Sequence, residues 1–290
     1  IGCGYLVEPV EVPIREGETA AKQLLRLLAE HGLVGYHGGT VKASFYLAYI
    51  ADGTASGERY NGYQKGPSPE NPRTLGLTPA IPSVLIPHLE ESMTFFDPDD
   101  YTKNWVGYLG EFAFSNGSGW MYAVNNVFPN VGFADSYLSD GDVVRVQFTL
   151  GYGADIGGAA AMGTDMPDGG TVPAGGYFPV ANKDQLTKAV CRARVSGLLS
   201  SAHVENAYRA ALAVMVTPDA TQKSVDDAAA ALAEAVAHPD SETSQTSEPG
   251  IGAAAEPAGC SSVLTSGTVV CILPAVCILA VLSRMRRGDA

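Results

Sequence analysis

The chain has 290 residues, of which 46% are apolar and 17% are charged, and this composition excludes a wholly disordered protein. Its net charge of −13 argues against a nucleic-acid binder, because contacts with phosphates need clustered Lys and Arg side chains. Five cysteines are too few for a disulfide scaffold. Because residue 1 is Ile, we expect the natural start of the chain, with any signal peptide, to lie upstream.

Residues 1–152 alternate between strand-like and helix-like patterns. An edge strand or extended segment is predicted at 5–14, where Pro9 and Pro13 interrupt the alternation. Thr19 is the expected N-cap of a leucine-rich helix that stops at Gly32. Further strand-like patterns lie at 45–50, 121–124 and 143–150. One helix after a first strand, followed by mainly antiparallel strands, predicts an α+β domain.

Four blocks of this region carry a family resemblance: EGETAAKQLLRLLAEHG, FYLAYIADG, SGWMYAVNNVFPN and YLSDGDVVRVQFT. The sequences of these blocks, and their order along the chain, resemble the bacterial transcobalamin-like C-terminal domain family over about residues 5–152. The resemblance implies a β-grasp-like ligand-binding module with one main helix, here enlarged by an insert at 52–110. The vitamin carriers of this kind place a large helical barrel before the domain, and the present sequence shows no such barrel. The resemblance therefore supports the fold better than it supports cobalamin binding.

Two regions of low complexity divide the rest of the chain. Residues 153–176 are rich in Gly and in turn signals, and we expect a linker there. Residues 240–262 consist of Ser, Thr, Pro, Gly, Glu and Ala with almost no large apolar side chain. Such a composition cannot bury a core, so these residues are expected to form a disordered stalk.

The region between them, 177–239, is predicted to be a bundle of three helices. Asn182 with Gln185 resembles a capping box, and Ser201 and Thr221 are the expected caps of the second and third helices. The run DATQKSVDDA resembles the FIVAR repeat of Gram-positive surface proteins. That resemblance implies a small three-helix module, which in the family is usually a spacer in adhesins and glycan-active enzymes.

The C-terminal region carries the pattern of a membrane anchor. Residues 263–283 hold no charge over 21 residues, and a helix of that length spans about 30 Å, the thickness of a hydrocarbon core. Arg284, Arg286 and Arg287 follow at once, which predicts a cytoplasmic tail at 284–290 and extracellular modules before the span. A buried core helix is the alternative interpretation. The layout also resembles a sortase signal, although no Leu-Pro-x-Thr-Gly precedes it.

Catalytic and metal-binding patterns are absent from the sequence. The five His residues lack zinc-site spacing, and the acidic groups at 97–100 and 140–142 lack the rest of a calcium loop, so turn formation explains them better. Neither Ser118 nor Cys191 lies in a nucleophile motif with recognisable partners. We therefore expect no enzyme activity, no catalytic residue, no metal and no cofactor.

Aromatic residues are the best candidates for a ligand surface. Trp120 and Tyr122 alternate along one predicted strand and so share a face. The other candidates are Asn125, Asn126, Phe128 and Tyr46. Rings beside amide groups suit sugars or flat ligands, but the same two rings on one strand also fit the core of a sheet.

Together these features predict a non-enzymatic protein held at the cell membrane by one C-terminal helix. Its expected role is to bind a corrinoid or another small molecule. A glycan- or protein-binding adhesin-type wall protein is one alternative. The C-terminal, non-catalytic part of a larger surface enzyme is the other.

Overall fold

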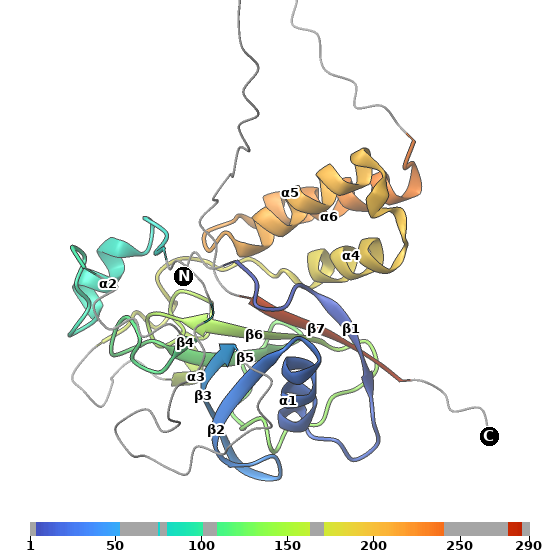
Figure 1. Ribbon diagram of the computed structural model, residues 1–290. Coiled ribbons are helices and arrows are strands. Elements are labelled where there is room, and N and C mark those ends of the chain that lie inside the picture. The colour runs from blue at the N-terminus through green and yellow to red at the C-terminus, as the bar shows by residue number, and fades with distance from the viewer. Residues whose placement is uncertain are drawn as a thin grey trace, which may run out of the picture.

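The computed structural model describes residues 4–52, 75, 80–100, 109–162, 171–240 and 278–285 (Figure 1). These residues form two small sheets and six α-helices, which confirms the mixed α/β character predicted from the sequence. The larger sheet has the order β1–β7–β6–β5 and consists of Val10–Ile14, Ile278–Met285, Val143–Thr149 and Gly119–Val124. The smaller sheet has the order β2–β3–β4 and consists of Leu33–Thr40, Ala43–Asp52 and Leu109–Gly110.

Helix α1 (Ala20–Glu30) covers one face of the larger sheet. Thr19 is its N-cap, as predicted, and the hydroxyl oxygen of Thr19 accepts a hydrogen bond from the amide of Lys22. The chain leaves the helix through Gly32 at φ 70°, a left-handed conformation that glycine adopts without steric cost. The buried leucines of α1 share one core with Val144 and Val146 of β6.

The hairpin of β2 and β3 shows one strand that the sequence patterns missed. Strand β2 contains three glycines, which lower its apparent β propensity. At Gly35 an added Cβ would lie 2.9 Å from side-chain carbons of both Leu25 and Leu28. The missing side chain thus lets β2 pack directly against α1. Helices α2 (Ile86–Ser92) and α3 (Ala159–Met162) were also not predicted.

The predicted linker at 153–176 is packed where the structure describes it. Ala154, Asp155 and Ile156 are buried, and an added Cβ at Gly153 would lie 2.8 Å from the carbonyl carbon of Gly158. The glycines therefore permit close packing of the backbone rather than flexibility. Where the structure describes it, at 153–162, the segment predicted as a linker is thus packed into the fold, while 163–170 lie outside the described residues.

Helices α4 (Asp184–Val195), α5 (Ala202–Val216) and α6 (Gln222–Ala237) lie on the face of the sheet opposite α1 (Figure 1). Ser201 and Thr221 cap α5 and α6 through their hydroxyl oxygens, as predicted. The expected capping box at the start of α4 differs, because Asn182 accepts the amide of Asp184 and the side chain of Gln185 is not needed. The core of these helices includes Ile156 from the sheet side, so the three helices are docked on the sheet.

The end of the predicted membrane helix is extended in this structure. Strand β7 lies between β1, to which it runs parallel, and β6, to which it runs antiparallel. The predicted helix at 263–283 is therefore not helical at 278–283, and 263–277 lie outside the described residues together with the predicted stalk beyond residue 240. A long apolar run fits a lipid-facing helix and a buried central strand equally well, which is why sequence alone does not distinguish them. In the part of the chain that is described, no helix has the length and apolar character needed to cross a membrane.

Candidate functional site

Of the two predicted platform residues, Tyr122 lies within the core beside the larger sheet and Trp120 is partly buried against it. The indole Nε1 of Trp120 donates a 3.0 Å hydrogen bond to the carbonyl oxygen of Leu109, and its ring meets Phe148 edge-on at 5.2 Å between centroids. Tyr122 is 8% exposed, and its ring stacks on Phe133 at 3.8 Å. These contacts favour the core interpretation for both residues over a ligand platform.

The two predicted asparagines shape a turn between β5 and β6. Asn125 and Asn126 both have positive φ, 49° and 62°, which asparagine tolerates better than most residues. The Oδ1 atom of Asn125 accepts the amide of Val143 at 3.0 Å, and Oδ1 of Asn126 accepts a hydrogen bond from Nη2 of Arg145. Their amide groups are therefore engaged in holding the turn and the buried arginine.

The last two predicted residues point to different parts of the molecule. Phe128 is half-buried and packs against the core of the three C-terminal helices. Tyr46 lies on β3 and is 45% exposed. The structure therefore does not bring the six predicted ligand residues onto one surface.

The acidic groups that could have bound calcium form turns instead. The Oδ1 atom of Asp97 accepts the amides of Asp99 and Asp100, each at 3.1 Å. Asp142 accepts the amide of Ser139 at 2.7 Å. Among the residues that the structure describes, no group of three or more His, Cys, Asp or Glu side chains is placed to hold a metal ion.

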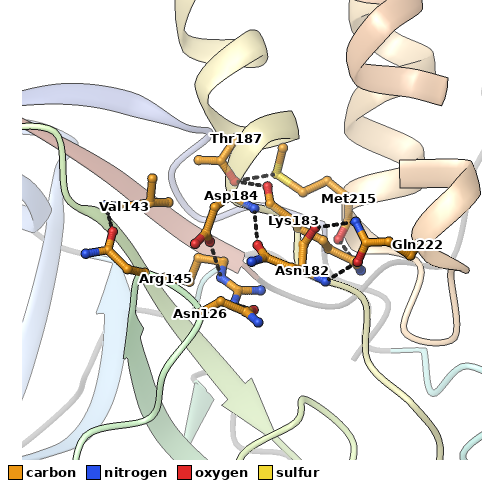
Figure 2. A network of polar contacts seen from close by, with 10 residues as sticks. Asn126, Val143, Arg145, Asn182, Lys183, Asp184, Thr187, Met215 and Gln222 are labelled. Atoms are coloured by element: carbon orange, nitrogen blue, oxygen red, sulfur yellow. Dashed lines mark hydrogen bonds and ion pairs between the residues drawn. The ribbon is translucent and has the colours of Figure 1, made fainter. Parts of the chain in front are cut away.

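A buried polar network joins the larger sheet to the C-terminal helices (Figure 2). Arg145 of β6 is 1% exposed, and its Nε lies 3.6 Å from Oδ1 of Asp184 at the start of α4. Burial lowers the pKa of Arg145, and the neighbouring Asp184 carboxylate opposes that shift. Along β6, Arg145 alternates with the apolar residues Val144 and Val146, and the C-terminal helices cover the face on which it lies.

Lys183 is the second buried cation of this network. Its Nζ donates hydrogen bonds to the carbonyl oxygens of Met215 at 2.8 Å and Thr217 at 2.6 Å (Figure 2 shows Lys183 beside Met215). Burial lowers the pKa of Lys183 to about 7, and the like charge of Arg145 adds to that shift. The lysine thereby ties the entry of α4 to the end of α5.

A small cavity lies beside this network and is of about the size of one water molecule. It is lined by Arg145, Gln147, Asp155, Ile156, Val180, Lys183, Val216 and Pro218. Within the described residues, Nη1 of Arg145 and Oε1 of Gln147 have no hydrogen-bond partner. The cavity is therefore bordered by one unpaired donor and one unpaired acceptor.

An exposed aromatic pair lies elsewhere, at the edge of the insert. Phe95 and Phe112 are 43% and 50% exposed, and their rings meet at an angle of 62° with centroids 6.3 Å apart. Phe112 adopts φ 61°, and its amide donates a 3.0 Å hydrogen bond to the carbonyl oxygen of Ser118. No sequence pattern marked this pair, because the two rings come from segments that only the fold brings together.

Part of the chain matches a protein-family model. Residues 100–150 match a family model described as a domain of unknown function (DUF4430), a transcobalamin-like family. The described part of this match contains β4, β5 and β6. It agrees with the transcobalamin-like resemblance over these residues. No curated protein and no solved structure matches the chain.

Proposed function

We propose that this chain is a non-enzymatic ligand-binding protein of the cell surface, with the ligand held at the aromatic pair Phe95–Phe112. The observation that carries the proposal is that Phe95 and Phe112 are each more than two-fifths exposed and that their rings contact one another at the edge of the insert. Exposed aromatic pairs are a common means of binding sugars and flat ligands. A transcobalamin-like match over 100–150 is consistent with a binding module of the β-grasp type.

The conformation of Phe112 supports a functional role for this pair. A positive φ costs a non-glycine residue about 1–2 kcal/mol, and such residues persist where the surrounding structure holds them. The Phe112 amide donates a hydrogen bond to Ser118 in that conformation, and Phe112 is 50% exposed. Strained residues of this kind are concentrated at binding sites.

The charge of the chain limits the kind of ligand. A net charge of −13 disfavours a polyphosphate and suits a neutral or cationic molecule. We therefore infer a small ligand with an apolar ring face, and the transcobalamin-like resemblance makes a corrinoid the first candidate. A neutral glycan offers a similar face and is the second.

The binding proposal is tested by titrating the full chain with cyanocobalamin and with a panel of neutral glycans. We expect one of them to bind, and Phe112→Ala to weaken binding at least tenfold, which corresponds to about 1.4 kcal/mol. Tyr137→Ala is the matched control, because Tyr137 is also exposed, at 66%, but is not part of the proposed site. This variant should bind the ligand with unchanged affinity. Absence of binding by the parent chain, or equal affinity of Phe112→Ala, would contradict the proposal.

The surface location rests on the apolar segment 263–283 and the three arginines that follow it. We infer that this segment crosses the membrane in the anchored protein, and that the FIVAR-like helices lie between the ligand module and the membrane. A segment cannot be in the bilayer and in the sheet at the same time. The extended conformation of 278–285 therefore belongs to the chain when it is outside a membrane.

Protease treatment of intact cells tests the topology. External protease should remove an epitope placed within residues 4–240, while a tag at residue 290 should survive until the cells are opened. Protection of both epitopes would contradict an extracellular location. Release of the intact chain from membranes by alkaline carbonate would contradict the anchor.

A further inference from the structure

Two buried cations line the small cavity between the larger sheet and the C-terminal helices. They are Arg145 of β6 and Lys183, the residue before α4, which are 1% and 3% exposed. Figure 2 shows Arg145 reaching from the sheet toward the start of α4, where Lys183 lies. Among the described residues that line this cavity, Asp155 is the one carboxylate. The wall therefore carries two positive charges against one negative charge when all three groups are ionised.

The two carboxylates near the cavity are engaged by other groups. Oδ1 of Asp155 accepts a hydrogen bond from the hydroxyl of Thr149, and its Oδ2 accepts the amide of Leu150 at 2.9 Å. Burial raises the pKa of Asp155, which favours its neutral form. Asp184 does not line the cavity, and its Oδ1 lies 3.6 Å from Nε of Arg145. These carboxylates therefore compensate the positive charge at the cavity only in part.

Both cations have donors that a further ligand could use. Nη2 of Arg145 donates to Asn126, whereas Nη1 has no hydrogen-bond partner among the described residues. Nζ of Lys183 donates to the carbonyl oxygens of Met215 and Thr217, and an ammonium group has three N–H bonds. A buried charged donor without an acceptor is unfavourable, and its strongest acceptor is a negatively charged one.

The repulsion between the two cations also favours an anion. The pKa of Lys183 falls to about 7 because burial and the like charge of Arg145 both disfavour the ammonium form. A negative charge between the two groups would attract both and offset that repulsion. The lining also includes Ile156, Val180 and Val216, whose apolar side chains exclude water and so strengthen electrostatic attraction.

The size of the cavity restricts the anion to a single atom. Its volume is about that of one water molecule, so phosphate, sulfate and carboxylate groups are too large. Chloride is slightly larger than a water molecule, and its burial costs less hydration free energy than that of the smaller fluoride ion. Charge and volume together therefore favour a weakly hydrated halide.

The side-chain amide of Gln147 distinguishes a halide from a water molecule. Gln147 lines the cavity, and its Oε1 has no hydrogen-bond partner among the described residues. The two ends of an amide have the same shape, so a half-turn presents Nε2 in place of Oε1. A halide selects the orientation with Nε2 toward the cavity, whereas a water molecule accepts either.

We propose that this cavity is a binding site for one halide ion, chloride in the first place, held by Arg145, Lys183 and the amide of Gln147. These groups come from β6 and from the entry to α4, so the bound ion stabilises the docking of the C-terminal helices on the larger sheet. The site is separate from the aromatic pair Phe95–Phe112 and does not depend on the function proposed for that pair.

The test refolds the full chain in sodium chloride, bromide, fluoride or gluconate at matched ionic strength, so that general screening is the same in each. The pH is held at about 6, where Lys183 carries its charge. We expect the urea midpoint to rise saturably with chloride and bromide and to stay unchanged with fluoride and gluconate. Crystals grown in bromide should show an anomalous peak beside Nη1 of Arg145. Equal midpoints in chloride and gluconate, or density for a water molecule without an anomalous peak, would overturn the proposal.

Two variants assign the effect to this cavity. Lys183→Met removes one lining cation, and the concentration of chloride that gives half of the midpoint shift should rise at least tenfold. Arg192→Met removes an exposed positive charge from the same helix and should leave that concentration unchanged. Gln147→Glu places a carboxylate where the halide would bind, and its urea midpoint should not depend on chloride. Equal chloride dependence in Lys183→Met, Gln147→Glu and the parent chain would show that the ion binds elsewhere.

Discussion

The Nε atom of Arg145 lies 3.6 Å from Oδ1 of Asp184, and this pair connects the middle of β6 to the first residue of α4. The arginine side chain is 1% exposed and that of the aspartate 12% exposed. The charge of Arg145 is thus compensated by a carboxylate that comes from a different part of the fold. The sheet and the C-terminal helices are therefore expected to unfold together rather than one by one.

Removing one member of this pair should destabilise the protein strongly. In Asp184→Ala the guanidinium of Arg145 would stay buried without a counter-charge, and we expect a loss of about 3–5 kcal/mol in the free energy of unfolding. The double variant Arg145→Met with Asp184→Leu should recover most of that loss, because it buries no charge. Urea denaturation measures both.

The exposed pair of Lys223 with Asp227, 2.6 Å apart on α6, is the matched control for that experiment. Lys223→Ala should change stability by less than about 0.5 kcal/mol, since surface ion pairs contribute little. A loss for Asp184→Ala no larger than that of Lys223→Ala would show that the buried pair does not hold the sheet to the helices.

Lys183 should make stability depend on pH near neutrality. Burial lowers the pKa of Lys183 to about 7 in the folded chain, whereas in the unfolded chain it titrates near its ordinary value, about 10.4. Between these two pKa values the unfolded chain binds more protons than the folded chain, so the free energy of unfolding should rise as the pH rises. The window to measure is pH 7 to about 8.5, because burial raises the pKa of Cys191 and Tyr177, which act in the opposite direction at higher pH.

Lys183→Met should abolish this rise, whereas Lys188→Met, on the same helix, should retain it. Chemical denaturation at half-unit steps of pH gives the slope for each variant. An identical slope in Lys183→Met and in the parent chain would assign the pH dependence to other groups.

Two glycines of the predicted linker should respond differently to substitution. Gly153 has φ 85°, and its added Cβ would meet backbone atoms of Gly158 at 2.8 Å, so Gly153→Ala should cost at least about 2 kcal/mol. Gly175 has open space around the Cβ position, and Gly175→Ala should be neutral or stabilise by up to about 1 kcal/mol. Thermal melting of both variants measures the contrast. Equal melting temperatures of Gly153→Ala and Gly175→Ala would show that the segment around Gly153 is flexible, and would contradict the packed conformation described above.

Trp120 should behave as a core residue. Trp120→Ala removes the edge contact with Phe148 and the hydrogen bond to Leu109, and we expect it to lower the free energy of unfolding by about 3–5 kcal/mol. Tyr137→Ala, at an exposed position, should stay within about 0.5 kcal/mol of the parent. A Trp120→Ala variant with an unchanged melting curve and reduced ligand affinity would instead support the ligand-platform interpretation.

Local signals in the sequence determined the helices best. The caps Thr19, Ser201 and Thr221 all accept backbone amides at the predicted helix starts. Capping acts within three or four residues, so the necessary information lies in one short stretch of sequence. Strands β3, β5 and β6 were found for a similar reason, since their residues have an apolar or alternating pattern of their own.

Tertiary structure decided which faces are buried. All seven residues of β6 are buried, including the polar residues Arg145, Gln147 and Thr149, which alternate with apolar ones along the strand. Alternation shows that a strand has two chemically different faces, but it does not show whether a second layer covers the polar one. Here helices α4–α6 and the loop at 153–158 supply that layer.

The sequence by itself determined the acidic charge, the starts of α1, α5 and α6, the mixed α/β character and the transcobalamin-like resemblance over 100–150, because each follows from composition or from contiguous residues. Only the tertiary structure placed Phe95 beside Phe112 and 278–285 between β1 and β6. Both relationships join segments far apart in the chain. Their formation depends on which packed arrangement satisfies the backbone hydrogen bonds and buries the apolar surface of the whole molecule, and no local window of sequence carries that information.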